Sequence, residues 1–147
     1  MKDPLWMLLE DKGREIHSVT PETAVVDAVD TMNSHRVGAL LVMDGNDLVG
    51  MFTERDVLCR VVSPGLHPAA TRVRDVMTHE VMYVSPTTTV EEAMGIITAK
   101  RCRHLPVQDG GRVIGVISIG DLTRWVTRGH VFQLQQLINY ITDRYPA

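Results

Sequence analysis

The chain contains two copies of one sequence pattern. At an offset of 65 residues, 19–61 aligns with 84–126 without a gap, and thirteen of the 43 aligned positions are identical. The identities include the proline that opens each copy, an Asp-Gly pair in its middle and a Gly-x-x-x-x-x-Asp pattern near its end. Self-similarity at a fixed offset predicts that both copies fold as the same unit and pack against each other.

Each copy is predicted to begin with an extended piece and a helix. The extended piece ends before the opening proline, because the residue preceding a proline is pushed out of the helical region. Apolar residues then recur at helical spacing over 25–32 and 90–97. Thr88 and Glu91 are expected to form a capping box at the start of the second helix.

Two apolar runs around an Asp-Gly turn follow in each copy and predict a tight hairpin. The expected strands are 39–43 and 48–52 in the first copy, and 105–107 and 113–119 in the second. A last helix is expected over about 54–62 and about 120–126. The order in each copy is therefore β-α-β-β-α.

The segments outside the copies complete the predicted organisation. Leu5–Glu10 is expected to be a helical lead-in to the first copy, and Val73–Met77 a lead-in to the second. Apolar residues after the second copy repeat at helical spacing and predict an amphipathic tail helix; they are Val131, Leu134, Leu137, Ile138 and Ile141. The predicted divisions are 1–62 for lead-in and first copy, 63–72 for a linker, 73–128 for lead-in and second copy, and 129–147 for the tail.

Composition excludes several classes of function. With 147 residues, 44% of them hydrophobic, the chain can bury a core without disulfides. A net charge of −3 without runs of like charge argues against nucleic-acid binding and anionic membranes. The early apolar stretch, Leu5–Leu9, is too short to span a membrane. Cys59 and Cys102 show no metal-ligand spacing, so we expect no metal site and a reduced, cytoplasmic location.

Two segments carry a resemblance to a known family. They are Gly-Met-Phe-Thr-Glu-Arg-Asp at 50–56 and Gly-Val-Ile-Ser-Ile-Gly-Asp at 115–121, supported by Arg-His-Leu-Pro-Val at 103–107. The chain resembles a tandem pair of CBS domains, the Bateman module, in the form of a small stand-alone bacterial protein. The resemblance implies an α/β (α+β) fold whose two repeats are related by a pseudo-twofold axis, with two clefts between them.

In that family the clefts bind adenosine-bearing ligands such as AMP, ADP, ATP, NAD or S-adenosylmethionine, and the module regulates rather than catalyses. The resemblance therefore implies a nucleotide sensor that forms a flat homodimer and acts on a separate effector protein. The tail helix is a candidate to line the dimer interface. The sequence does not support an enzymatic function, since it offers no nucleophile-base-acid set and no Gly-rich phosphate loop.

The resemblance assigns ribose binding to Asp56 and Asp121, and phosphate or ribose contacts to Thr53 and Ser118. An ionised carboxylate can accept hydrogen bonds from both vicinal hydroxyls of a ribose. The backbone at the start of each copy, at Thr20 and Ser85, is expected to enclose the base. The same Thr/Ser-x-x-Asp spacing is also typical of a helix cap, and the two roles are compatible.

The copies differ where Gly38-Ala39 of the first aligns with Arg103-His104 of the second. Gly38 and Ala39 leave room for a base, whereas Arg103 and His104 suit a phosphate. The two clefts are therefore predicted to be chemically different.

Predictions for four other positions complete the sequence analysis. Arg55 is a further candidate for phosphate contact. Arg36 and Arg101 are expected to be solvated cations at helix ends. The arginines beside Cys102 are expected to lower the pKa of its thiol. The alternative to a sensor is a structural interaction subunit with vestigial clefts.

Overall fold

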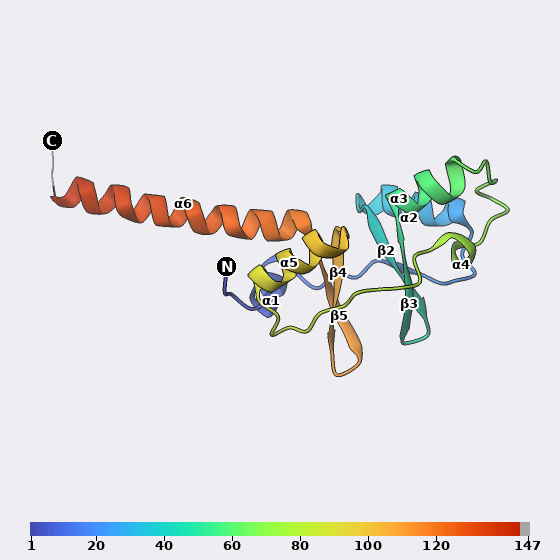
Figure 1. Ribbon diagram of the computed structural model, residues 1–147, viewed down its shortest axis with the longest axis horizontal. Coiled ribbons are helices and arrows are strands. Elements are labelled where there is room, and N and C mark those ends of the chain that lie inside the picture. The colour runs from blue at the N-terminus through green and yellow to red at the C-terminus, as the bar shows by residue number, and fades with distance from the viewer. Residues whose placement is uncertain (145–147) are drawn as a thin grey trace.

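The computed structural model describes residues 1–144 and has the mixed α/β architecture expected, with a long C-terminal helix (Figure 1). The first copy forms a three-stranded sheet in the order β1-β2-β3, in which β1 and β2 are parallel and β2 and β3 antiparallel. Its elements are β1 (Ser18–Val19), α2 (Val25–His35), β2 (Ala39–Asp44), β3 (Asp47–Thr53), α3 (Glu54–Asp56) and the π-helical η1 (Val57–Val62).

The second copy repeats this order with a two-stranded antiparallel sheet. Its elements are α5 (Val90–Lys100), β4 (His104–Asp109), β5 (Arg112–Ser118) and α6 (Ile119–Arg144). The extended piece before Pro86 is reduced to one parallel bridge between Val84 and Val107. In both hairpins the turn glycine, Gly45 or Gly110, has a positive φ of about 60°, which a residue without a Cβ adopts at low cost.

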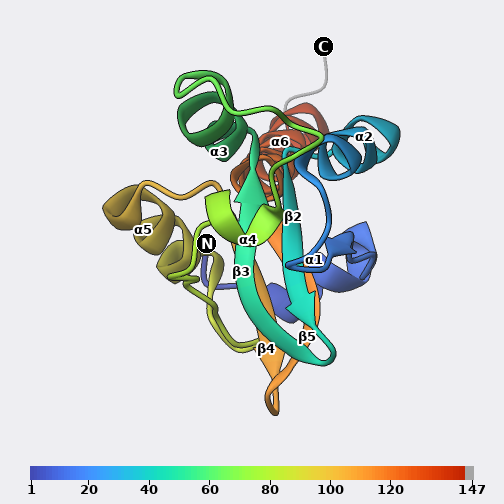
Figure 2. The same cartoon turned by 90° about the vertical axis from the view of Figure 1, so that its right-hand side faces the viewer.

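The two lead-ins are exchanged between the copies, which differs from the sequence prediction. The lead-in helix α1 (Leu5–Lys12) buries Leu5, Leu8 and Leu9 in the core of the second copy. Conversely, α4 (Val73–Val76) and Met77 pack in the core of the first copy. Each copy therefore completes its core with a segment that precedes the other. In Figure 1, α1 lies beside α5, β4 and β5, and Figures 1 and 2 both show α4 beside β3.

Equivalent backbone hydrogen bonds hold both lead-ins. The N–H of Leu5 donates to the C=O of Thr88 at 2.8 Å, and the N–H of Val73 donates to the C=O of Thr23 at 2.9 Å. Thr23 and Thr88 are themselves aligned in the repeat. The pattern of apolar residues predicts that each lead-in is a helix, but it carries no information about which of two similar cores receives it.

Two further predictions need correction. The last helix of the second copy and the tail helix are one continuous helix, α6, and its first turns are tied to the N-terminal segment by the Trp125 indole N–H, which donates to Asp3 at 2.9 Å. The capping box of α5 is formed by Thr89 and Glu92 rather than by Thr88 and Glu91. The hydroxyl of Thr88 instead accepts the N–H of Ser85 in the preceding turn.

No helix within residues 1–144 is both long and apolar enough to cross a membrane. The predicted cytoplasmic location stays a prediction.

Candidate functional site

The two Thr/Ser-x-x-Asp segments form capping boxes at the ends of the hairpins. In the second copy, the N–H of Ser118 donates to Asp121 Oδ2 at 2.8 Å and the N–H of Asp121 donates to Ser118 Oγ at 3.1 Å. In the first copy, Thr53 and Asp56 make the same pair of hydrogen bonds at 3.0 and 3.2 Å. The cap fixes each carboxylate at the first turn of a helix, where backbone N–H groups are also available.

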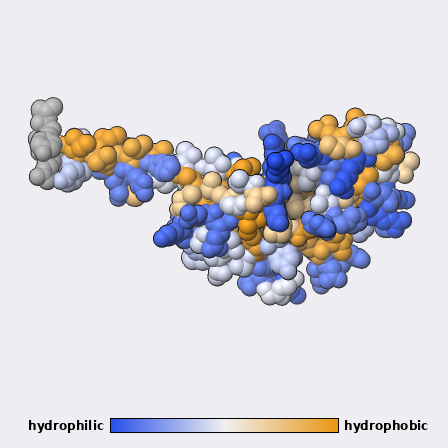
Figure 3. All heavy atoms as spheres, in the orientation of Figure 1, coloured by the Kyte–Doolittle hydropathy of each residue, from blue (hydrophilic) through white to orange (hydrophobic). Residues whose placement is uncertain are grey.

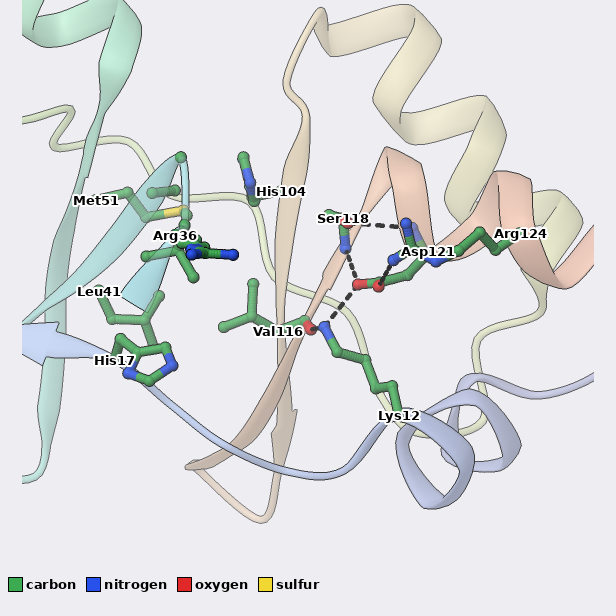
Figure 4. A pocket seen from close by; sticks show the side chains of 13 residues that line it. Lys12, His17, Arg36, Leu41, Met51, His104, Val116, Ser118, Asp121 and Arg124 are labelled. Carbon is green, nitrogen blue, oxygen red and sulfur yellow. Dashed lines mark hydrogen bonds and ion pairs between the residues drawn. The ribbon is translucent and has the colours of Figure 1, made fainter. Parts of the chain in front are cut away.

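Two cations hold the carboxylate of Asp121. Lys12 Nζ donates to Asp121 Oδ2 at 2.6 Å, and Arg124 Nη2 donates to Asp121 Oδ1 at 2.6 Å (Figure 4). The same lysine donates to the C=O of Val116 at 2.8 Å. Burial alone would raise the pKa of Asp121, but the hydrogen bonds from Lys12 and Ser118 outweigh it and hold the pKa below its ordinary value. Asp121 is therefore an ionised acceptor.

A cavity of about 300 Å³ opens beside this carboxylate, between the sheets of the two copies. One wall comes from the second copy and from Lys12 of α1, and the other from His17, the turn at 36–38, β2 and β3 of the first copy (Figure 4). Its lining residues are Lys12, His17, Arg36, Val37, Gly38, Ala39, Leu41, Met51, His104, Val116, Ser118, Asp121 and Arg124. Lys12 and Arg124 lie beside Asp121, whereas Arg36 and His17 lie with Leu41 and Met51 on the other wall (Figure 4).

His104 faces this cavity from β4, where it pairs across the hairpin with Ser118. Desolvation lowers the pKa of His104 below its ordinary value of 6.5, and the positive charge of Lys12 adds to this effect. The negative charge of Asp121 opposes it without cancelling it. Near pH 7 the imidazole is therefore neutral and offers one donor and one acceptor.

The corresponding carboxylate of the first copy is covered by the chain segment at Thr78. The side chains of Asp56 and Asp121 are almost equally buried, at 7% and 8% exposed, but the Thr78 hydroxyl donates to the Asp56 carboxylate at 3.1 Å. The backbone of Thr78 also forms a bridge with Met51 of β3, with both N–H···O distances below 3.0 Å. Arg60 Nε lies 3.8 Å from Asp56 Oδ1 and completes its surroundings.

The predicted site residues are thus divided by the fold. Five of them line the cavity together: Gly38, Ala39, His104, Ser118 and Asp121. Six others lie outside its lining: Thr20, Thr53, Arg55, Asp56, Ser85 and Arg103. The side chain of Thr20 contacts Thr23, and that of Ser85 contacts Thr87 and Thr88 within their own turns. Arg55 and Arg103 are exposed.

Sequence reasoning missed four polar residues of the cavity, namely Lys12, His17, Arg36 and Arg124. Lys12 reaches it because α1 packs on the second copy, which the sequence does not reveal. Arg36 ends α2 in the left-handed conformation, with φ of 54°, and this turn directs the chain toward Gly38. The sequence did contain one signal for Arg36, since the aligned residue of the second copy, Arg101, is also an arginine.

The cysteine prediction is wrong. Burial raises the pKa of the Cys102 thiol, and a smaller backbone hydrogen-bond contribution does not reverse this. The neighbouring arginines therefore do not activate it. Among residues 1–144, no group of three or more His, Cys, Asp or Glu side chains could hold a metal ion.

The comparisons with known proteins show the family of this chain. The family model for the CBS domain matches the chain twice, over 13–63 and 73–128. The chain belongs to the CBS-domain family. A mitochondrial CBS domain-containing protein of Arabidopsis thaliana, CBSX3, is 40% identical over 131 residues, which span 86% of this chain and 64% of that protein. The chain thus spans less than two thirds of this relative.

Solved CBS-domain structures have the same fold. A CBS-domain protein from Burkholderia ambifaria superposes with a TM-score of 0.82 at 45% identity, over 84% of this chain and 93% of that one. The CBS domain protein PAE2072 from Pyrobaculum aerophilum, solved in complex with AMP, superposes with a TM-score of 0.73 at 23% identity, over 81% and 89% of the two chains. CBS pairs of this kind are regulatory modules.

Proposed function

We propose that this CBS pair is a regulatory module that binds one phosphorylated adenosine ligand in the cavity beside Asp121. The observation that carries the proposal is the ionised, helix-capping carboxylate of Asp121, which lines a cavity together with cations on both walls and with Leu41 and Met51 opposite. At about 300 Å³ the cavity is at the small end of the range for ligand sites. The AMP complex of the related fold supports an adenine nucleotide as the ligand class.

Each part of the ligand has a matching part of the cavity. The base would lie against Gly38, Ala39 and Leu41, whose small or apolar side chains suit a flat ring. The ribose hydroxyls would donate to Asp121. The phosphate would be held by Arg124 and by other cations of the cavity. AMP, ADP, ATP and NAD all offer these groups, whereas S-adenosylmethionine lacks the phosphate.

Ribose binding has a cost in this cavity, since Lys12 and Arg124 already occupy both carboxylate oxygens. We propose that the ribose displaces Lys12, whose ammonium then turns toward the phosphate. A flexible, partly exposed lysine can make this exchange through side-chain rotation alone. The movement of Lys12 would thereby couple ligand binding to the end of α1.

The regulatory output, in this proposal, passes to a separate effector protein or through a homodimer of the chain. The saturated carboxylate of Asp121 also suits the alternative function, a structural subunit with vestigial clefts. A titration with nucleotides decides between the sensor and the structural subunit, because a structural subunit needs no nucleotide.

The test is calorimetric titration of wild type, Asp121→Asn and the matched Asp56→Asn with AMP, ATP, NAD, adenosine and S-adenosylmethionine. Asp121→Asn is expected to weaken AMP binding by about 1.5 to 3 kcal/mol, or roughly ten- to a hundredfold, because a hydrogen bond to a charged acceptor is lost. Asp56→Asn should leave the affinity within about twofold. Absence of nucleotide binding by wild type would favour the structural subunit, and equal losses in both variants would refute the assignment to Asp121.

A second titration tests the role of Lys12. In Lys12→Met the carboxylate of Asp121 is partly released, so adenosine should bind at least as tightly as to wild type. AMP should lose the phosphate contact, and the ratio of AMP to adenosine affinity should fall by about tenfold. An unchanged ratio would show that Lys12 does not contact the phosphate.

A further inference from the structure

Arg36 lies on the wall of the cavity opposite Asp121 (Figure 4). Apart from histidines, the cationic residues that line the cavity are Lys12, Arg36 and Arg124. Lys12 and Arg124 already form ion pairs with Asp121, at 2.6 Å each. Among residues 1–144, by contrast, the guanidinium of Arg36 forms no hydrogen bond or ion pair. Arg36 can therefore bind an anionic ligand without breaking another contact.

The turn that carries Arg36 is held on both sides. Arg36 ends α2 in the left-handed conformation, with φ of 54° and ψ of 45°. Before it, the ring of His35 stacks on the ring of His17, with the two centroids 4.0 Å apart. After it, the C=O of Gly38 accepts the N–H of Glu54 at 3.0 Å. The base of the Arg36 side chain is thus fixed at the edge of the cavity.

This conformation is unfavourable for an arginine, because the Cβ atom approaches the following carbonyl oxygen. Glycine avoids the contact and is the usual residue at such a helix end. Arg101, the aligned residue of the second copy, has the same conformation with φ of 53° but does not line the cavity. The chain therefore contains the same strained arginine twice, once with access to the cavity and once without it.

The shape of a ribose determines which wall the phosphate faces. The 2′ and 3′ hydroxyls lie on one edge of the sugar ring, whereas the base and the 5′ carbon are attached on the two sides of the ring oxygen, at the opposite edge. When both hydroxyls contact Asp121, the base and the 5′ phosphate are directed toward the wall of the first copy. The base then meets Gly38 and Ala39, and the phosphate meets Arg36. A planar guanidinium can donate two parallel hydrogen bonds to a phosphate.

The charge of the cavity favours a terminal phosphate. Strongly hydrophilic side chains gather where the two copies meet (Figure 3). Apart from its histidines, the cavity lining carries three cations and one carboxylate, which leaves a surplus of two positive charges. A phosphate monoester carries about −1.5 to −2 charges near pH 7, whereas a phosphodiester carries a single negative charge. A volume of about 300 Å³ also favours a mononucleotide over a dinucleotide.

We infer that Arg36 binds the terminal phosphate of the ligand from the wall opposite Asp121, and that the cavity selects a nucleoside monophosphate over phosphodiesters and dinucleotides. The inference rests on the proposed function, since it assigns an orientation and a phosphate-binding residue to the same ligand. Lys12, once displaced from Asp121, would approach the same phosphate from the other wall. The phosphate would then lie between two cations that belong to opposite walls.

The test is calorimetric titration of wild type, Arg36→Gly and the matched Arg101→Gly with AMP, adenosine and the methyl ester of AMP, whose phosphate is a diester. Wild type should bind AMP about tenfold more tightly than the methyl ester. Arg36→Gly should weaken AMP binding by about tenfold and leave adenosine binding within about twofold, because only the phosphate loses a contact. Arg101→Gly should keep both affinities within about twofold.

Thermal unfolding separates the loss of the guanidinium from damage to the fold. Both glycine variants relieve the left-handed conformation of an arginine, so both should melt about 2 °C higher than wild type. An Arg36→Gly variant that is more stable and yet binds AMP less tightly has lost a ligand contact and not its fold. Arg36→Lys keeps the charge without the planar fork and should weaken AMP binding by about threefold.

Three results would overturn the inference and leave the proposed function intact. An Arg36→Gly variant with the wild-type ratio of AMP to adenosine affinity would show that Arg36 does not hold the phosphate. An equal loss of AMP affinity in Arg101→Gly would assign the effect to the helix end and not to the cavity. Equal binding of AMP and its methyl ester by wild type would refute the selection of a monophosphate. Failure of the proposed function gives a different result, since wild type would then bind no nucleotide.

Discussion

In the first copy the backbone of Thr78 lies against β3, whereas in the second copy the side chain of Lys12 takes the corresponding place. Met51 and Val116 are aligned in the repeat, and the C=O of Met51 accepts the N–H of Thr78 while the C=O of Val116 accepts the ammonium of Lys12. A backbone bridge with two hydrogen bonds closes the cleft. A lysine side chain can move away, so the second cleft is the one that can open.

The two lead-ins produce this difference. Both insert an apolar residue against a strand glycine: an added Cβ at Gly50 would lie 2.7 Å from Met77 Sδ, and one at Gly115 would lie 2.6 Å from Leu9 Cδ2. Beyond these contacts with the strand glycines, the two lead-ins differ. The helix α4 ends at Val76 and its chain continues as an extended segment, but α1 continues for another turn to Lys12. One additional turn of helix thus replaces a closing strand with a charged side chain.

Removal of each aspartate gives the largest expected contrast between the copies. Asp56→Ala should destabilise the fold by about 3 kcal/mol, because the Thr53 N–H and the Thr78 hydroxyl lose a buried acceptor. Asp121→Ala removes the matching acceptor of the Ser118 N–H at an almost equally buried position, and we expect a smaller cost of about 2 kcal/mol, since Lys12 and Arg124 can return to water. Urea unfolding of both variants measures the difference, and equal losses would show that the first cleft is no more closed than the second.

The two strand glycines give a smaller contrast. In Gly50→Ala the new methyl would meet Met77 Sδ and also the backbone C=O of Thr78, at 2.8 Å, so we expect a loss of about 2 kcal/mol. In Gly115→Ala the obstacle is the side chain of Leu9, which can rotate, and about 1 kcal/mol is expected. Thermal unfolding of the two variants tests whether the contact at Thr78 is stiffer than the contact with Leu9. A larger loss of stability in Gly115→Ala than in Gly50→Ala would contradict this expectation.

Much of this molecule could be predicted from its repeat. The order of elements and the hairpins follow from apolar spacing and Asp-Gly turns, and the Ser118/Asp121 cap follows from its three-residue interval. The exchange of lead-ins could not be predicted, because α1 and α4 present similar apolar faces to two similar cores. Lys12 is therefore absent from the sequence-based site, although it contacts Asp121 as closely as Arg124 does, at 2.6 Å.

The closed state of the first cleft was also beyond the sequence. Thr53 and Asp56 satisfy the same motif as Ser118 and Asp121, and nothing in the motif indicates that Thr78 will cover one of them. That outcome depends on where a helix ends after a long linker, and the ends of short helices are weakly determined by local residues. The sequence comparison assigns Gly38-Ala39 and Arg103-His104 to different clefts, but Gly38, Ala39 and His104 line the same cavity.

His104 provides the smallest and most specific test of the difference between the copies, since its aligned residue in the first copy is Ala39. The pKa of His104 is lowered in the folded chain, so the unfolded chain binds more protons as the pH falls below 6.5. The contribution to stability is therefore complete above pH 6.5 and is lost on acidification. Because the side chain is half-buried, we expect a loss on the order of 1 kcal/mol or less.

The variant His104→Ala gives the second copy the residue of the first and should remove this loss. Urea unfolding at several pH values between 7.5 and 5 would show a shallower decline for the variant than for wild type. Asp121 does not confuse the result, because its lowered pKa affects stability only below its ordinary value of 3.8. Identical pH dependence in both proteins would mean that His104 is solvated in the folded chain, and the cavity would then be wetter and less selective for an apolar base than its lining implies.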